Sequence, residues 1–274
     1  MNASLPIAAV VYAVFSMPVL AQSGPLVERY MERSGLVSLV ARVDGKMQVA
    51  IDRALAQPSA PKLNAEQLDR LRGAVKVAYD ADRLRESLQS NLMAQLPGGD
   101  TERFVSWLDT PFGKRVTAVE SMATTPEGQR RAAELVANTY DETSVERKSI
   151  LDRLAKKSGL VDLAVILALE QEIGVAQGMA ALTGTDYRGP WRESDKSEQR
   201  RKQTDAAAKA WVMNAAVVYA PLSDDELGQY VAVLERASMQ RVLEATGRAL
   251  EKTLTGAVTE LLRQLASAAA KPTN

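Results

Sequence analysis

Two glutamates that follow an apolar stretch have the surroundings that could suit acid–base chemistry. Glu170 and Glu172 come after the run Ala164–Leu169, and Ile173 follows them directly. A carboxyl group in apolar surroundings can act as a general acid because its pKa is raised, and a second carboxylate would complete a glycosidase pair. Residues two apart lie on different faces of a helix, so we do not expect these two to pair with each other. The alternative, which helical patterning favours, places both on the solvent side of an amphipathic helix.

A segment with two aromatic and two basic side chains is the best candidate for binding. Tyr187, Arg188, Trp191 and Arg192 lie within 183–193, the longest irregular stretch of the chain. Exposed aromatic residues and arginines commonly anchor interfaces, and aromatic rings also stack on sugars. Because the first half of the chain has no equivalent insertion, we predict that these four residues form a binding site added to a helical scaffold. The commoner alternative is a loop whose tryptophan fills the core.

Cysteine and histidine are both absent from the 274 residues. Their absence excludes disulfides, thiolate nucleophiles, Ser-His-Asp triads and metal sites with Cys or His ligands. Carboxylate, lysine, tyrosine and serine–lysine chemistry remain. Enzymatic activity is therefore open but not expected, and we predict no cofactor and no metal ion.

Positive and negative charges balance, with 34 Lys and Arg residues against 34 Asp and Glu residues. Nucleic-acid binders usually carry a basic excess because phosphate contacts dominate their affinity, so we expect no nucleic-acid partner. One basic run, Arg200–Lys202 with Lys196 nearby, could meet an anionic lipid or polymer. A solvated helix start is its more common meaning. Thr183–Thr185 lacks the Gly-Lys-Ser/Thr of a phosphate-binding loop.

The N-terminus has the features of an export signal. Ile7–Leu20 is apolar and of signal-peptide length, which is short for a bilayer span, and Pro18–Ala21 places small or aliphatic residues before a cleavage site. We predict that residues 1–21 are a signal peptide cleaved after Ala21, and that the protein is periplasmic or secreted by a bacterium. No Lys or Arg precedes the run, so a buried or membrane-associated helix is the alternative. No later segment is apolar enough for a transmembrane span.

An internal repeat sets the expected architecture. Ser34–Val37 recurs as Ser158–Val161, an offset of 124 residues (158 − 34), and Phe104-Val105 corresponds to Tyr230-Val231 at an offset of 126 (230 − 104). Helix-forming residues dominate the chain, and no alternating run indicates a strand. We predict an all-α fold in which two pseudo-repeated helical units pack into one compact multi-helix body. The predicted units are residues 25–140 and 141–270.

Capping residues and apolar stripes predict where the helices begin and end. Capping boxes are expected at Asn64 with Gln67, Thr124 with Glu127, Thr143 with Glu146, and Ser223 with Glu226, and Asp100 is a further candidate cap. Gly35 and Gly45 are expected to break or bend the first helices. The Leu and Val stripe between Leu243 and Leu265 is expected to pack on the core, although such a stripe could also bind a partner helix.

The segment Thr110-Pro111-Phe112-Gly113 predicts a helix corner, because proline removes a helical hydrogen bond and glycine permits a close backbone approach. Glu102–Arg115, which contains it, and Ser223–Val231 together resemble the domain-of-unknown-function 2059 family of exported bacterial helical proteins. That family's element is an acidic helix start, an aromatic, Ser/Thr-Pro-x-Gly and a basic or apolar helix. The second copy departs from it at Arg236–Met239. The resemblance implies an all-helical exported protein and carries no activity or catalytic residues.

Three functional hypotheses follow. The first is a non-enzymatic envelope interaction or scaffold protein that uses the groove between the units or the loop Tyr187–Trp191 to hold another envelope protein. The second is a binder of a small apolar or lipid ligand inside the helical layers. The third is a carboxylate-based hydrolase acting on cell-wall glycan, which would need two carboxylates facing across a cleft. The oligomeric state stays open.

Overall fold

The computed structural model describes residues 19–58, 60–184 and 196–269, and all regular elements in these residues are helices. The prediction of an all-α fold is confirmed. The helices are α1 (Val19–Arg33), α2 (Leu36–Val40), α3 (Val43–Leu55), α4 (Ala65–Ala78), α5 (Ala81–Gln95), α6 (Gly98–Leu108), α7 (Pro111–Ala123), α8 (Pro126–Glu142), α9 (Val145–Lys157), α10 (Leu160–Thr183), α11 (Lys196–Val218), α12 (Asp224–Leu234) and α13 (Ala237–Ala269).

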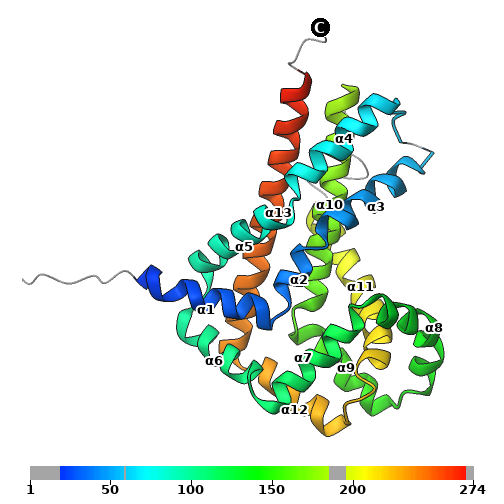
Figure 1. The fold of residues 1–274 in the computed structure, drawn as a ribbon. Coiled ribbons are helices and arrows are strands. Elements are labelled where there is room, and N and C mark those ends of the chain that lie inside the picture. The colour runs from blue at the N-terminus through cyan, green and yellow to red at the C-terminus, as the bar shows by residue number, and fades with distance from the viewer. Residues whose placement is uncertain (1–18, 59, 185–195, 270–274) are drawn as a thin grey trace, which may run out of the picture.

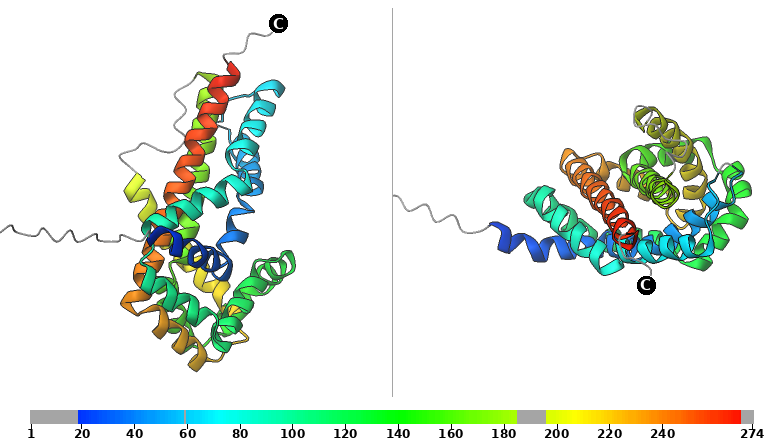
Figure 2. Two further views of the ribbon diagram at one scale, coloured as in Figure 1. Left: turned by 60° about the vertical axis from the view of Figure 1, so that its left-hand side comes forward. Right: turned by 90° about the horizontal axis from the view of Figure 1, so that it is seen from above.

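The two longest helices, α10 and α13, pack side by side and connect the two parts of the molecule (Figure 1). One part, the arm, consists of α3 and α4 packed on α10 and on the C-terminal half of α13. The other part, the base, contains α6 to α9, α11 and α12. α1 and α5 lie where the arm meets the base, and the views from the side and from above show the same arrangement (Figure 2).

The core follows α10 and α13. The predicted stripe of α13 is buried against α10, α4 and α5, so it packs on the chain's own core as expected. Two glycines of α10 allow neighbouring helices to come close: a Cβ atom at Gly174 would lie 2.7 Å from the Tyr79 hydroxyl, and one at Gly178 would lie 2.8 Å from Leu71. The arm is therefore held by close packing along α10.

Two of the predicted capping boxes form as expected. Asn64 accepts a hydrogen bond from the Gln67 backbone at 2.8 Å, and the Gln67 side chain accepts one from the Asn64 backbone at 3.0 Å. Ser223 and Glu226 make the same pair of bonds at 3.2 and 2.8 Å. Each pair satisfies two backbone N–H groups that the first helical turn leaves without a partner.

Three other predicted helix starts are wrong, two of them by one residue and one by three residues. The caps of α8 and α9 are Thr125 and Ser144, because Pro126 takes the first helical position of α8 and Ser144 accepts from the Arg147 backbone at 3.1 Å. Asp100 does not cap α6, which begins at Gly98. Its carboxylate is buried and accepts a hydrogen bond from Arg241 of α13 at 2.7 Å. Gly45 lies inside α3 and does not break it.

The predicted corner at Thr110 joins α6 to α7. Thr110 donates to the carbonyl of Trp107 at 2.7 Å and accepts from the Gly113 backbone at 3.0 Å. A side chain at Gly113 would overlap the Trp107 carbonyl, so glycine is required there. The same Thr-Pro-x-Gly pattern recurs unpredicted at Thr125–Gly128, where it joins α7 to α8 with the same two bonds.

Positions related by the sequence repeat also correspond in structure. Gly35 and Gly159 have φ angles of 76° and 68°, and each directly precedes a helix. The ranges of α6 (98–108) and α12 (224–234) differ by the same 126 residues at both ends. α1 packs on α5 and α6, as α9 packs on α11 and α12.

An ion pair recurs at the same offsets. Arg29 of α1 binds Asp109 at the end of α6, and Arg153 of α9 binds Glu235 at the end of α12. These features support the predicted pseudo-repeat. The repeat and its division into units 25–140 and 141–270 stay predictions.

Candidate functional site: a groove with one carboxylate at its floor

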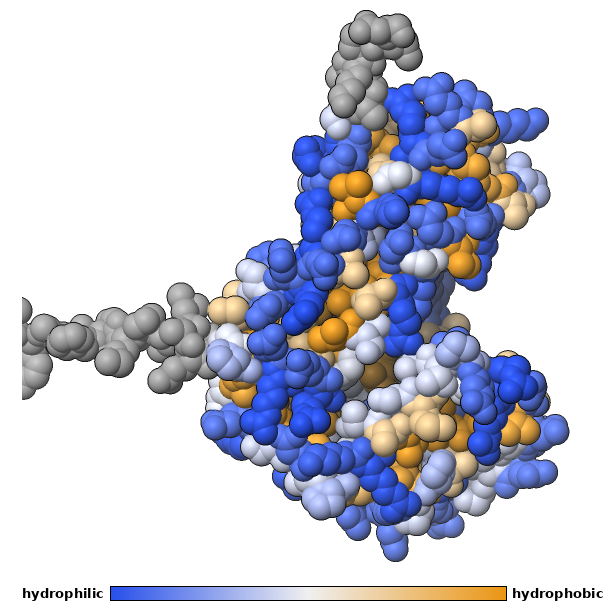
Figure 3. All heavy atoms as spheres, in the orientation of Figure 1, coloured by the Kyte–Doolittle hydropathy of each residue, from blue (hydrophilic) through white to orange (hydrophobic). Residues whose placement is uncertain are grey.

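A groove of about 340 Å³ lies between α2, α7 and α11 and also reaches the first residue of α10. Its size suits a small molecule. The space-filling view shows the surface hollowed between the arm and the base, with apolar residues in the hollow (Figure 3). The apolar part of the groove lining includes Leu39, Leu160, Trp211, Ala215 and Val218.

Glu120 of α7 is the one carboxylate among the described residues that line this groove. The residue is half-buried, and its Oε1 accepts two hydrogen bonds, from the Tyr219 hydroxyl at 2.6 Å and from the Tyr230 hydroxyl at 3.0 Å. Within the described chain no donor binds Oε2. One carboxylate oxygen is therefore fixed by two tyrosine hydroxyls of the protein.

Burial raises the pKa of the Glu120 carboxyl, and the hydrogen bonds from Tyr219 and Tyr230 oppose that rise. The pKa of both tyrosines is raised well above the ordinary value, first by burial and then by the charge of Glu120. The tyrosines therefore stay protonated and act as fixed donors. A carboxyl group with a raised pKa in a groove is a common mark of a binding or catalytic site.

Two arginines fix the turn that carries Tyr219. Arg147 of α9 donates to the carbonyls of Tyr219 at 2.7 Å and Leu222 at 2.9 Å and also binds Asp224. Arg115 of α7 donates to the Pro221 carbonyl at 2.9 Å and binds Glu226. Since the turn between α11 and α12 is held from both sides, the Tyr219 hydroxyl is preorganised.

Tyr230 is fixed by an aromatic stack. Its ring lies parallel to that of Trp107, with ring centroids 5.5 Å apart and an interplanar angle of 6°. Trp107 in turn packs against Phe104 and Phe112, with ring centroids 6.0 and 6.3 Å apart. The Thr110–Gly113 corner therefore has a role beyond turning the chain, because it packs the rings that hold one donor of Glu120.

A smaller cavity of about 70 Å³ adjoins the groove at Glu120. It shares Ser34, Thr117, Glu120 and Leu160 with the groove, so the carboxyl lies between the two spaces. The cavity is large enough for ordered water, and its polar lining includes Ser158. Ser34-Gly35 of the first predicted unit and Leu160 of the second both line the Glu120 groove, which therefore lies between the predicted units.

The rim of the groove carries one permanent cation. Arg42, in the link between α2 and α3, donates from Nε to the Ser38 carbonyl at 2.8 Å and from Nη1 to the Thr124 carbonyl at 3.0 Å. These bonds tie the end of α2 to the end of α7. Arg42 therefore closes one side of the groove and forms no ion pair with Glu120.

The structure separates the two glutamates that the sequence singled out. Glu170 is buried in α10 with 3 % of its surface exposed, so its predicted solvent-facing position is wrong, whereas Glu172 is exposed as expected. Burial raises the pKa of Tyr79, and the charge of Glu170 raises it further, which places this glutamate near the α4–α10 contact of the arm. Glu170 does not line the groove, and the groove offers Glu120 alone where a glycosidase would need two carboxylates.

The predicted binding residues Tyr187, Arg188, Trp191 and Arg192 lie outside the described residues, so their role stays a prediction. In the basic run, Arg201 and Lys202 are exposed on α11, as a solvated helix start would be. The Arg201 Nη1 atom lies 4.0 Å from Oδ2 of Asp205, which is one helical turn later. The described part of the chain contains no cluster of three or more side chains suited to a metal ion.

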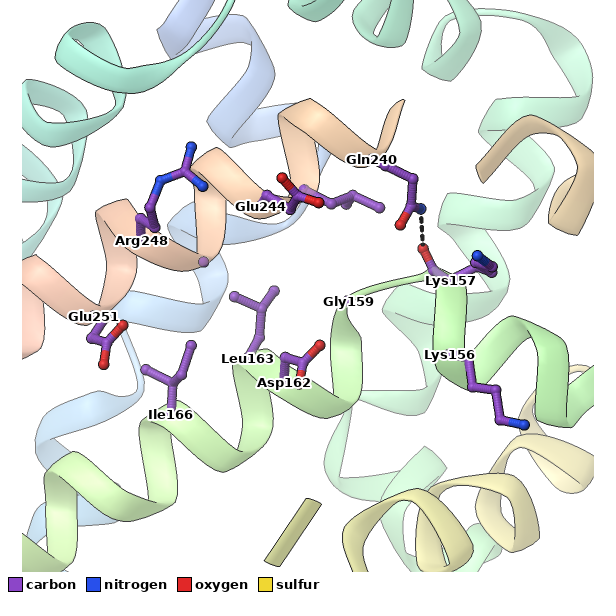
Figure 4. Close-up of a pocket in the computed structure, with 12 residues that line it drawn as sticks. Lys156, Lys157, Gly159, Asp162, Leu163, Ile166, Gln240, Glu244, Arg248 and Glu251 are labelled. Carbon is purple, nitrogen blue, oxygen red and sulfur yellow. Dashed lines mark hydrogen bonds between the residues drawn. The ribbon is translucent and has the colours of Figure 1, made fainter. Parts of the chain in front are cut away.

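A second space of about 340 Å³ separates the start of α10 from α13 (Figure 4). Leu163 and Ile166 point from α10 toward α13, whereas Lys156 projects away. Gln240 donates to the Lys157 carbonyl at 2.9 Å and so joins α9 to α13. Acidic and basic side chains alternate around this space, and none of them is deeply buried, so no single ligand charge is favoured.

A third space, of about 330 Å³, lies between α7, α8 and α11. It is mostly apolar, includes the exposed side chain of Met122, and has Arg115 and Arg131 at its edge but no carboxylate. Of these three spaces, the Glu120 groove alone combines apolar walls with a half-buried charge that two hydroxyl groups orient.

Sequence reasoning missed Glu120, although one signal was present. Glu120 lies four residues after Val116 on α7, so it falls on the buried face of that helix. A carboxylate at that position has to find partners, and the partners are Tyr219 and Tyr230. Both lie about a hundred residues away in sequence, and the sequence pattern does not show which helix α7 meets.

Comparisons of the chain with protein-family models, with curated proteins and with solved structures each find no match. The resemblance to the domain-of-unknown-function 2059 family therefore stays a hypothesis that rests on two segments. Among the described helices, none combines the length and the apolar composition that a membrane span requires.

Proposed function

We propose that the chain is a binding protein whose groove between the predicted units holds a small, mainly apolar ligand. The observation that carries the proposal is the Glu120 groove, in which apolar walls surround one preorganised carboxylate. Small-molecule sites typically combine such walls with a few convergent polar groups. Of the three hypotheses from the sequence, this favours the binder of a small ligand.

The groove gives less support to the hydrolase, and its volume suits a small molecule better than the envelope protein that the scaffold hypothesis would place in the groove. A hydrolase acting on glycan would need a second carboxylate, and Glu120 has none beside it in the groove. An envelope scaffold role through Tyr187–Trp191 involves residues outside the described chain. It remains a proposal to be tested separately with a variant of Trp191.

Ligand-observed NMR with phenethyl alcohol, a neutral apolar probe, tests the proposed function. Saturation transferred from the protein to the probe reports binding. Ser38→Trp places a large ring at the mouth of the groove, because Ser38 is exposed there. The matched control is Ser90→Trp, at an exposed position of α5 that lines none of the three spaces described above.

We expect saturation transfer in the wild type and in Ser90→Trp, and its loss in Ser38→Trp. Absence of transfer to the wild-type protein would contradict the proposed function. Equal transfer in all three proteins would show that the probe binds elsewhere and would contradict the assignment to this groove.

We further propose that the protein is exported after cleavage at Ala21. The buried side chain Val27 of α1 lies six residues after Ala21 (27 − 21), so it stays in the chain when residues 1–21 are removed. Pro25 lies inside α1 as it stands but would fall in the first turn of a helix that begins near Gln22, where its missing N–H costs nothing. The intact mass of protein purified from its own cells tests this. A chain that begins at Gln22 is expected, and a full-length chain would contradict it.

A further inference from the structure

The charge pattern of the groove indicates the chemistry of its ligand. We infer that the ligand carries a primary ammonium group on an apolar body, with the ammonium bound to Oε2 of Glu120 and the body packed against Trp211. This inference rests on the proposed function and adds the ligand class to it. Three observations carry it.

The first observation is that Glu120 has no cationic partner in the described chain. Its two hydrogen bonds come from neutral tyrosine hydroxyls. The described cations that line the groove and the cavity adjoining it are engaged elsewhere: Arg42 donates to two backbone carbonyls, and Arg33 binds Asp109 at 3.1 Å. A half-buried carboxylate gains most from a partner of opposite charge, and the side open to the groove is where one can enter.

The second observation is the aromatic wall. Trp211 is half-buried and lines the groove beside Tyr219, with the two ring centroids 6.1 Å apart. Indole faces attract cations and also bury apolar groups. A carboxylate next to such rings favours an organic ammonium ion over a bare metal cation, which would need several oxygen ligands.

The third observation is the contrast with the two neighbouring spaces. The third space, between α7, α8 and α11, has arginines and no carboxylate among its described lining residues. The space between α10 and α13 has carboxylates, but they alternate with Lys156, Lys157 and Arg248. An ammonium ligand is therefore expected to select the Glu120 groove.

Three probes of similar size that differ in their polar group test the inference. Phenethylamine carries an ammonium, phenethyl alcohol a hydroxyl, and phenylacetate a carboxylate. Their dissociation constants are measured by NMR titration against the wild type and Glu120→Gln, a change that keeps the shape of the side chain and its acceptor oxygen. Circular dichroism verifies that the variant folds.

The wild type should bind phenethylamine about tenfold or more tightly than phenethyl alcohol, because a hydrogen bond to a charged group is stronger than a neutral one. Phenylacetate should bind most weakly. Glu120→Gln should lose the preference for the amine while its affinity for the alcohol changes little. Equal affinities for amine and alcohol in the wild type would overturn the inference but leave the proposed function standing, whereas failure of the alcohol to bind would contradict the proposed function itself.

A second variant keeps the inference testable if Glu120→Gln does not fold. Tyr219→Phe removes one hydroxyl that lowers the pKa of Glu120, so the pH above which the amine binds should move upward. Tyr30, Arg33, Arg42 and Tyr230 are the other charged or titratable groups among the described residues that line the two spaces, and this change leaves all four in place. An unchanged pH profile of amine binding would argue against Glu120 as the ammonium partner.

Discussion

Glu120 shows how one residue acquires a role from its surroundings. Its position on the buried face of α7 would be unfavourable for a carboxylate in an apolar core. Two tyrosine hydroxyls and a half-buried position in the lining of the groove offset this, because the hydroxyls satisfy one carboxylate oxygen and the side chain is not fully enclosed. A group held in this way has a different ionisation equilibrium in the folded and unfolded chain, which makes protein stability sensitive to pH.

The raised pKa of Glu120 predicts a specific pH dependence. A carboxyl whose pKa is higher in the folded state stabilises the fold below its unfolded pKa, and this contribution is lost as the pH rises through the folded pKa. The stability of the wild type relative to Glu120→Gln should therefore fall as the pH increases. Denaturant unfolding of both proteins from about pH 4 to about pH 8 measures this. Glu86→Gln, an exposed control on α5, should not reproduce the trend, and a constant difference between wild type and Glu120→Gln would contradict the account.

Gly113 should tolerate no side chain. A Cβ atom there would overlap the Trp107 carbonyl. To make room, the backbone of the corner between α6 and α7 would have to shift, which is costly. We expect Gly113→Ala to lower the free energy of unfolding by about 2 kcal/mol or more. Gly73→Ala, on the exposed side of α4 with open space around it, should instead raise it by about 0.5–1 kcal/mol. Denaturant unfolding measures both changes. Equal changes in the free energy of unfolding for the two substitutions would show that the corner has room for a side chain at position 113.

At the scale of elements, the sequence predicts those helix ends that are formed by bonds and backbone preferences of residues a few positions apart. The capping boxes at Asn64 and Ser223 form because their bonds join residues three apart, and the Thr110 corner forms because proline and glycine act on their own backbone. The start of α6 was mispredicted because Asp100 has a distant partner, Arg241, that no local pattern reveals. A tertiary contact therefore explains the error at α6, whereas the one-residue errors at α8 and α9 arise within the local capping pattern itself.

Two of the three positive-φ glycines in the described residues provide a test at this scale. Gly35 and Gly159 precede α2 and α10 in the left-handed region, where a side chain costs about 1–2 kcal/mol. Gly35→Ala and Gly159→Ala should therefore destabilise the fold by similar amounts. Gly228→Ala, inside α12 with open space around it, should not destabilise it. If only one of the two substitutions lowered the stability of the fold, the two glycines would not have equivalent roles in the predicted repeat.

At the scale of the whole molecule, the all-α class and most helix positions could be predicted, but the groove could not. Periodicity identifies the buried face of a helix without identifying the helix that covers it. Glu120 meets Tyr219 and Tyr230 across 99 and 110 residues of sequence, and Arg147 reaches the carbonyls that fix Tyr219 across 72. The site is a product of how α7, α11 and α12 assemble, so the sequence directed attention to Glu170 and the aromatic loop instead.

The most direct test of the central claim is the side-chain carboxyl ¹³C resonance of Glu120, assigned by its absence in Glu120→Gln and followed against pH with and without phenethylamine. In the free protein the titration should show a pKa above the ordinary glutamate value. The bound ammonium should lower that pKa, because a nearby cation favours the ionised carboxylate. A resonance that titrates identically with and without the amine would contradict the assignment of this groove as a binding site for an apolar ammonium ligand.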